Sequence, residues 1–304
     1  MQPFDIHILG CGSALPTTRH NATSQVVEMR GKLYMIDCGE GTQLQLRRSR
    51  LHFSRLGHIF ISHLHGDHCF GLIGLISTFG LLGRTAPLHI YGHPDLEATL
   101  RPQLNYFCKG LAFEVVFHPI DPRRHELIYE DRSLTVHTLP LNHRIPCCGF
   151  LFREKEGMRH IKADMMEFYK VPLFARNLIK AGEDFTTPDG EVIPNDRLTT
   201  PADPARSYAY CSDTAYTPSL IPLLQGVDLL YHESTFAQCD EARATETHHC
   251  TAAQAATIAA QAGVKQLLIG HYSSRYDNEQ QLLDEAKALF PPTRLSNEGL
   301  TISL

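Results

Sequence analysis

The sequence lacks several features that would place it outside the ordinary soluble proteins. It contains no run of 18 or more apolar residues, so no transmembrane helix is expected. Its first residues lack a basic region followed by an apolar core, so we expect no secretory signal. Its nine cysteines are odd in number, scattered, and without a Cys-x-x-Cys pair. Reduced thiols in a cytoplasmic protein are therefore expected rather than a disulfide framework.

The chain also lacks an overall positive charge, since its net charge is −5. A nucleic-acid partner would therefore need locally concentrated cations, because phosphate contacts dominate such affinity. Residues 19–55 provide them, with seven Lys and Arg against three acids. Such a cluster is equally compatible with an ordinary solvated face.

The 304 residues suffice for one large domain or two small ones, and the hydrophobic content of 43% is that of a globular protein. No internal repeat or low-complexity segment is present. Strands followed by helices, repeated in the second half, predict an α/β protein with an αββα sandwich. Strands are expected at 4–9, 24–29, 32–37, 88–91, 113–118, 132–139 and 227–231, and helices at 42–48, 94–107, 218–224 and 251–262.

One short stretch concentrates metal-binding side chains. An apolar run at 58–61 predicts a buried strand, and a second run at 72–82 predicts a helix. Between them lie His63, His65, Asp67 and His68. Imidazole and carboxylate are usual ligands of zinc and similar ions. On an extended turn the first two can share one metal, while the last two point toward a second.

Three further strands end in residues of the same kind. The run 134–141 is followed by His143, the run 207–212 by Asp213, and the run 266–270 by His271. Each alone could simply cap a turn. Together with the histidine cluster, they predict a dinuclear metal site at a sheet edge.

This ligand pattern resembles the metallo-β-lactamase superfamily, and further stretches resemble the ribonuclease Z family in particular. The resemblance runs from about residue 5 to residue 303 and is weakest between 154 and 206. The specific stretches are Gly10–Asn21, Ile36–Gln43, His232–Thr235, His249–Thr251 and His271–Tyr276. The resemblance implies the αββα fold with two metals at the sheet edge, and an endoribonuclease that removes the 3′ trailer from precursor tRNA.

The resemblance also implies how the ligands are shared. His63, His65 and His143 would hold one metal, Asp67, His68 and His271 the other, and Asp213 would bridge them. Zinc is the expected metal, although His/Asp sites also accept manganese or iron according to supply. Asp37 would support the ligand histidines from outside the metal shell. A simple capping role is the alternative for Asp37.

The expected mechanism begins with a water that the metals acidify to hydroxide. Asp67 would orient it and accept its proton, and the hydroxide would attack the phosphodiester phosphorus. His249, oriented by Glu233, would protonate the leaving ribose oxygen; His248 is the alternative donor. The tRNA would keep a 3′-hydroxyl and the trailer a 5′-phosphate.

Substrate contacts are predicted on two loops. Arg275 and Tyr276 follow the predicted ligand His271, and the planar guanidinium of Arg275 suits a phosphate. A plain surface arginine is the less favoured alternative. On the first loop the candidates are Ser13, Thr17, Thr18 and Arg19.

Residues 154–206 differ from the rest in their many glycines and prolines and weak periodicity. They correspond in position to the arm with which family members grip tRNA. The usual Gly-Pro motif is absent, however, and Val171–Arg176 stands in its place. Basic and acidic residues are nearly balanced here, so the arm either binds tRNA through a few placed cations or serves a subunit contact. Family members usually form homodimers, which is expected here on resemblance alone.

Two other functions remain open at this point. A different hydrolase on the same metal core, such as a small phosphodiesterase or a thioester or lactone hydrolase, is kept open by the missing arm motif. The Asp37–Thr42 and His271–Tyr276 stretches argue against it. A non-catalytic RNA-binding scaffold is disfavoured, because every ligand position is filled.

Overall fold

The computed structural model describes residues 3–15 and 17–304. Met1 and Gln2, in the segment inspected for a secretory signal, and Pro16, in the Gly10–Asn21 stretch, lie outside the described residues. The chain divides into two compact units. The larger comprises the chain up to Arg153 together with Arg206–Leu304, and the smaller comprises Glu154–Ala205. None of the helices in the described ranges has both the length and the apolar character needed to cross a membrane.

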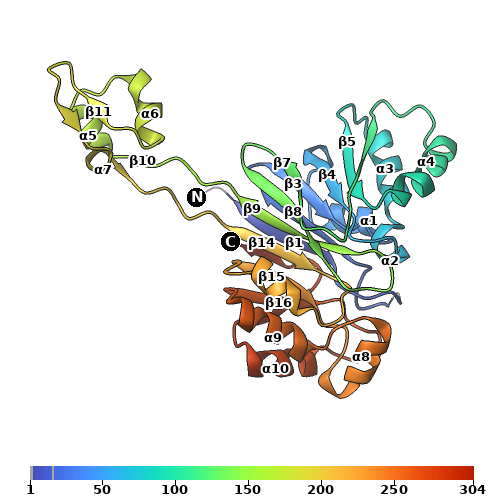
Figure 1. Cartoon of the computed structure of the whole chain (residues 1–304). Coiled ribbons are helices and arrows are strands. Elements are labelled where there is room, and N and C mark those ends of the chain that lie inside the picture. The colour runs from blue at the N-terminus through green and yellow to red at the C-terminus, as the bar shows by residue number, and fades with distance from the viewer. Residues whose placement is uncertain (1–2, 16) are drawn as a thin grey trace. The chain divides into compact units, whose positions relative to one another are not determined.

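The larger unit is built on two sheets of seven strands each (Figure 1). The first has the order β18 (Thr301–Ser303), β1 (Phe4–Gly10), β2 (Ser24–Met29), β3 (Lys32–Ile36), β4 (Leu56–Phe60), β5 (Leu88–Gly92) and β6 (Val115–Pro119). The second has the order β17 (Thr293–Leu295), β16 (Gln266–Gly270), β15 (Leu229–Glu233), β14 (Ser207–Cys211), β9 (Cys148–Glu154), β8 (Leu134–Pro140) and β7 (Leu127–Glu130). Strands β3 to β6 run parallel to one another, as do β14 to β17.

Helices cover the outer faces of both sheets (Figure 1). Those on the first sheet are α1 (Thr42–Arg48), α3 (Leu72–Leu81) and α4 (Asp95–Phe107), and those on the second are α9 (Ala252–Ala262) and α10 (Gln280–Leu289). One buried core includes residues of both sheets, such as Phe60, Phe150 and Tyr210, and a second joins the first sheet to α3 and α4. The predicted αββα sandwich is confirmed.

Shorter helical turns complete this unit: η1 (Phe53–Arg55), α2 (Gly66–Cys69), η3 (Pro218–Leu223), η4 (Gln238–Asp240) and α8 (Glu241–Thr247). Helix α9 shows how local sequence sets an element. The Thr251 hydroxyl accepts from the backbone N–H of Gln254, whose side chain accepts in return from the Thr251 N–H, forming a capping box. Gly263 ends the helix in the left-handed conformation, with φ of 61°.

Several predicted element boundaries need correction. The strands predicted at 113–118 and 132–139 are β6 at Val115–Pro119 and β8 at Leu134–Pro140. The strand before the histidine cluster begins at Leu56 rather than at residue 58, and β15 spans Leu229–Glu233 rather than 227–231. Glu233 is therefore the last residue of a buried strand. Strands β7, β9, β17 and β18 and helix α10 were not predicted. Strand β18 pairs with β1 from the opposite end of the sequence.

The smaller unit is a folded subdomain rather than an irregular excursion. Its elements are β10 (His160–Ile161), α5 (Ala163–Phe168), η2 (Leu173–Ala175), α6 (Arg176–Lys180), β11 (Phe185–Thr186), β12 (Val192–Ile193), α7 (Asn195–Leu198) and β13 (Thr199–Thr200). Met166, Ile179 and Leu198 are buried in a core of its own. The buried Asn195 amide donates to the carbonyl oxygens of Ile179 and Glu183, both at 2.7 Å, which closes this small core.

Candidate metal centre and active site

The predicted ligands meet at one edge of the two sheets because each follows the end of a strand. His63 and His65 follow β4, and α2 then presents Asp67 and His68. The other three lie just beyond β8, β14 and β16, namely His143, Asp213 and His271. Five of the seven line a cavity of about 620 Å³, namely His65, Asp67, His143, Asp213 and His271. Distant strand ends and one local cluster thus form a single site.

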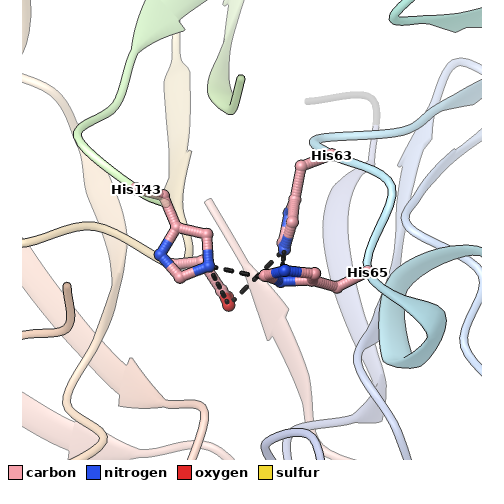
Figure 2. A group of neighbouring side chains, drawn as sticks. His63, His65 and His143 are labelled. Carbon is pink, nitrogen blue, oxygen red and sulfur yellow. Dashed lines mark hydrogen bonds and ion pairs between the residues drawn. The ribbon is translucent and has the colours of Figure 1, made fainter. Parts of the chain in front are cut away.

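The first group consists of three histidines whose rings point toward one another (Figure 2). His65 Nδ1 lies 2.9 Å from His63 Nε2 and 3.2 Å from His143 Nε2. Asp213 Oδ2 lies 3.6 Å from His63 Nε2 and 3.7 Å from His143 Nε2. Ligand atoms about 2.0–2.1 Å from a tetrahedral zinc ion are about 3.3 Å apart. The four atoms therefore fit one such ion.

The second group faces the other oxygen of the same aspartate. Asp213 Oδ1 lies 3.2 Å from His68 Nε2 and 3.1 Å from His271 Nε2. Asp67 Oδ2 lies 3.3 Å and 3.7 Å from these two nitrogens. Among the described residues, these atoms of Asp67, His68 and His271 are buried and have no hydrogen-bond partner. Buried polar atoms normally have one, so the arrangement fits a divalent ion at their centre.

Asp213 lies between the two groups, with one oxygen directed to each. Ser212 Oγ donates to Asp213 Oδ1 at 2.8 Å. Burial opposes ionisation of the Asp213 carboxyl, but His271, His68 and His63 lower its pKa well below the usual value. Its backbone has φ of +46°, and His271 has φ of +61°. These left-handed turns at strand ends direct both side chains into the site.

The histidines of the first group are neutral near neutral pH. Burial lowers the pKa of His63 and His65, and it lowers that of His143 to about 4. Neutral imidazoles offer the lone pair that a metal needs. His68 differs, because the carboxylates of Asp213, Asp37 and Asp67 outweigh burial and raise its pKa.

Asp37 supports the ligands from behind. Its Oδ2 accepts hydrogen bonds from His68 Nδ1 at 2.8 Å, from Ser62 Oγ at 2.9 Å and from the Tyr210 hydroxyl at 2.7 Å. Ser62 Oγ also lies 3.0 Å from His63 Nδ1. Since Ser62 donates to Asp37, it accepts from His63, and the network leaves the Nε2 atoms of both histidines facing the metal position. The Asp37 backbone has φ of +56°.

Glu233 organises the opposite side of the site. Its carboxylate accepts from His249 Nδ1 at 2.7 Å and from Thr235 Oγ1 at 2.6 Å. Thr235 Oγ1 in turn lies 2.9 Å from His271 Nδ1. Burial lowers the pKa of His249, but the Glu233 charge and hydrogen bond dominate and raise it to about 9.

Of the two adjacent candidates for the proton donor, His249 is among the described residues that line the cavity and His248 is not. His248 has φ of +57° at the end of α8, and its carbonyl oxygen accepts from His143 Nδ1 at 3.0 Å. The backbone at His248 therefore orients a predicted ligand, while the His249 side chain faces the reaction space.

Comparison with family models places the chain among proteins of this fold. The model described as Anti-Pycsar protein Apyc1 matches residues 4–173, and that described as Beta-lactamase superfamily domain matches residues 197–272. The first spans more than half of the chain, which therefore falls within the sequence family that this model describes.

Full-length relatives are more specific. Ribonuclease Z of Bacteroides fragilis is 65% identical over 304 residues, covering all of both chains. The chain belongs to the ribonuclease Z family. Ribonuclease Z of Porphyromonas gingivalis is 58% identical, again over the whole of both chains. The resemblance seen in the sequence is confirmed.

Solved structures agree with the ribonuclease Z fold. The short form of human tRNase Z is 26% identical, with a TM-score of 0.71 and 98% of each chain covered. A long-form RNase Z from yeast is 18% identical, with a TM-score of 0.69, and 99% of this chain covers 42% of it. The latter supports the fold alone. The ribonuclease Z family and its metallo-β-lactamase fold imply divalent metal ions, which the two groups of side chains fit.

Only some of the residues predicted to contact the substrate lie in the cavity. Ser13 and Arg275 are among the described residues that line the cavity, whereas Thr17, Arg19 and Tyr276 are not. The Arg19 guanidinium donates to the carbonyl oxygens of Tyr276 and Asp277. The Tyr276 hydroxyl donates to Asp240 and accepts from the backbone N–H of Ala237. The side chains of Arg19 and Tyr276 thus connect their loops to neighbouring segments by hydrogen bonds.

Several residues of the site were given no role from the sequence. Ser62 and Thr235 are the hydroxyls that link ligand histidines to Asp37 and Glu233. Both stand beside predicted site residues, and this adjacency was the only available signal. Arg144 and Arg243 line the cavity. Arg144 directly follows His143, but nothing in the local sequence of Arg243 distinguishes it from other helical arginines.

Proposed function

We propose that this chain is a metal-dependent endoribonuclease that removes the 3′ trailer from precursor tRNA in the cytoplasm. The observation that carries the proposal is full-length identity of 65% to a ribonuclease Z. In addition, the predicted ligand residues lie in two close groups, and five of the seven line one cavity. The substrate is a phosphodiester, and the products are a tRNA with a 3′-hydroxyl and a trailer with a 5′-phosphate.

The proposed cofactors are two zinc ions per chain. His63, His65 and His143 would hold the first and Asp67, His68 and His271 the second, with Asp213 shared between them. When bound, such ions acidify water and offset negative charge on phosphoryl oxygens.

Asp67 and His249 divide the proton transfers. Burial opposes ionisation of Asp67, but His68 and His271 lower its pKa, so that the group is an ionised carboxylate near neutral pH. We assign it to orient the attacking water and to accept its proton. His249 is an imidazolium below pH about 9. Its Nδ1 proton is bound to Glu233, which leaves Nε2 to protonate the departing 3′ oxygen as its bond to phosphorus breaks.

Two loops and the smaller unit are proposed to bind the RNA. Ser13 and Arg275 would contact it inside the cavity. Arg275 is already held in place by Asp240, at 3.0 Å, and by stacking over the Phe236 ring. In the smaller unit, Phe168, Leu173 and Phe174 are largely exposed. Such apolar tips favour stacking or packing contacts, either on tRNA or on the partner subunit of a homodimer.

The test is cleavage of an end-labelled precursor tRNA carrying a 3′ trailer, with and without prior chelation. We expect one metal-dependent cut directly 3′ of the mature end, lost in Asp67→Ala. Asp95→Ala changes an exposed aspartate on α4, outside the cavity, and should cleave normally. If the preparation hydrolyses bis(p-nitrophenyl) phosphate but not the RNA, the tRNA substrate is wrong and a small-phosphodiester hydrolase is favoured.

A further inference from the structure

A second cluster of metal-binding side chains lies outside the catalytic cavity. Cys11 follows β1, His20 lies near the end of the next loop, and Glu298 lies in the turn before β18. None of the three lines the cavity described above. The Cys11 side chain is fully buried, whereas His20 and Glu298 are 8% and 18% exposed. An ion could therefore reach the cluster from the carboxylate side.

The spacing of the three side chains is that of zinc ligands. Cys11 Sγ lies 3.4 Å from His20 Nδ1 and 3.7 Å from Glu298 Oε1, and His20 Nδ1 lies 3.1 Å from Glu298 Oε2. With Zn–S of about 2.3 Å and Zn–N or Zn–O of about 2.0–2.1 Å, a tetrahedral ion separates sulfur from nitrogen or oxygen by about 3.5 Å, and nitrogen from oxygen by about 3.3 Å. The sulfur–nitrogen distance agrees within a few tenths of an ångström, as do the distances from Cys11 and His20 to the two different oxygens of the Glu298 carboxylate.

The surroundings supply the support that a ligand histidine usually has. His20 Nε2 lies 3.1 Å from Glu279 Oε1, which is the carboxylate–histidine pairing found behind many metal ligands. Arg19 Nη1 lies 3.0 Å from the same oxygen and balances its charge. A thiolate at Cys11 and a carboxylate at Glu298 would then neutralise a dication. The sulfur ligand favours zinc over the hard cations magnesium and calcium.

We propose that Cys11, His20 and Glu298 bind a structural zinc ion, in addition to the metals of the catalytic cavity. The ion joins three segments that are distant in sequence. Cys11 also accepts, through its carbonyl oxygen, the backbone N–H of Tyr272 at 3.1 Å, and Tyr272 directly follows the ligand His271. The zinc ion would thus hold the first loop against the segment that carries a catalytic ligand.

Cobalt substitution tests this without relying on activity. Neither catalytic group of described ligand residues contains sulfur, so a near-ultraviolet thiolate-to-Co²⁺ band reports a cysteine site alone. The full-length protein is stripped with a chelator, reloaded with Co²⁺ and freed of excess metal. We expect the band in the wild-type protein, its loss in Cys11→Ala, and its retention in Cys108→Ala, which removes a buried thiol at the end of α4.

Metal counting of the zinc-loaded proteins gives an independent result. Cys11→Ala should hold about one zinc ion per chain fewer than the wild type or Cys108→Ala. Absence of the thiolate band in the wild-type protein overturns the proposal, even if Cys11→Ala does not fold. In that case His20 is held by hydrogen bonds to two glutamates, and the Cys11 thiol donates to the Ser296 carbonyl oxygen, 3.6 Å away. This outcome would leave the proposed ribonuclease activity untouched.

Discussion

Replacing Asp37 by asparagine tests whether a residue that is not itself a proposed metal ligand supports metal binding through the ligand histidines. Asp37 is fully buried, and its carboxylate accepts four hydrogen bonds and donates none. In Asp37→Asn one oxygen becomes an NH₂ group. At the Oδ1 position this group faces the backbone N–H of Ser62; at Oδ2 it faces His68 Nδ1 and two hydroxyl groups. In either orientation the NH₂ group faces another hydrogen-bond donor. In the second orientation, His68 Nδ1 must accept from the NH₂ group, so its proton moves to Nε2, the atom that faces Asp67 and Asp213.

The size of the effect follows from this network. Loss of a partner behind a metal-binding histidine typically lowers metal affinity about 10- to 100-fold, which corresponds to about 1.4–2.8 kcal/mol. The loss of a hydrogen bond to a charged group lowers the free energy of unfolding by about 1.5–3 kcal/mol in addition. Asp37→Asn should therefore bind zinc less tightly and unfold at a lower denaturant concentration.

The assay is competition for zinc with a chromophoric chelator, alongside urea unfolding. Asp131→Asn is the matched control, because Asp131 accepts from Lys32 Nζ, the Tyr34 hydroxyl and two backbone N–H groups, away from the metal site. It should lower stability without lowering zinc affinity. Wild-type zinc affinity in Asp37→Asn, or an equal loss in Asp131→Asn, would refute the role of Asp37.

Three further predictions follow from the described contacts. His249 is protonated below pH about 9 and loses its proton as the pH rises. Glu233→Gln removes the charge that raises this pKa, so the alkaline limb of the pH–rate profile should move to lower pH, toward about 6.5. An unmoved limb contradicts the pairing of His249 with Glu233. Thr251→Ala removes the capping box of α9 and should lower the free energy of unfolding in urea by about 1 kcal/mol. Gly71→Ala places a Cβ 2.1 Å from a backbone oxygen and should destabilise by about 1–3 kcal/mol, whereas Gly57→Ala, whose added Cβ meets no described atom within 4 Å, should not.

The metal centre could be predicted because its information is local. Four predicted ligands occupy six positions, and each remaining predicted ligand lies within two residues of the end of a predicted strand. The direction of loop side chains is not local in this sense. Arg19 and Tyr276 stand within the predicted substrate loops, yet their side chains bond to neighbouring segments whose approach no spacing rule describes.

The fold shows the same division. The αββα class follows from alternating strands and helices, but the pairing of β18 with β1 joins the two ends of the chain. Strand β18 has only three residues, too few for a periodic pattern. The hydroxyls of Ser62 and Thr235 were missed for a related reason, since a serine or threonine beside a ligand looks like any turn residue until its partner is known.

At three positions of the proposed metal centre, the backbone conformation is one that folding stability would assign to a different residue type. Asp37, Asp213 and His271 all have positive φ, a conformation that strains residues with a Cβ by about 1–3 kcal/mol each. Domains are stable by only about 5–15 kcal/mol in total. Aspartate and histidine adopt this conformation more readily than most residues that carry a Cβ, but glycine adopts it without that steric cost. Selection for stability alone would favour glycine or asparagine at these three positions. The side chains at these three positions therefore represent a trade-off, in which the site gives up some stability for the groups that its function requires.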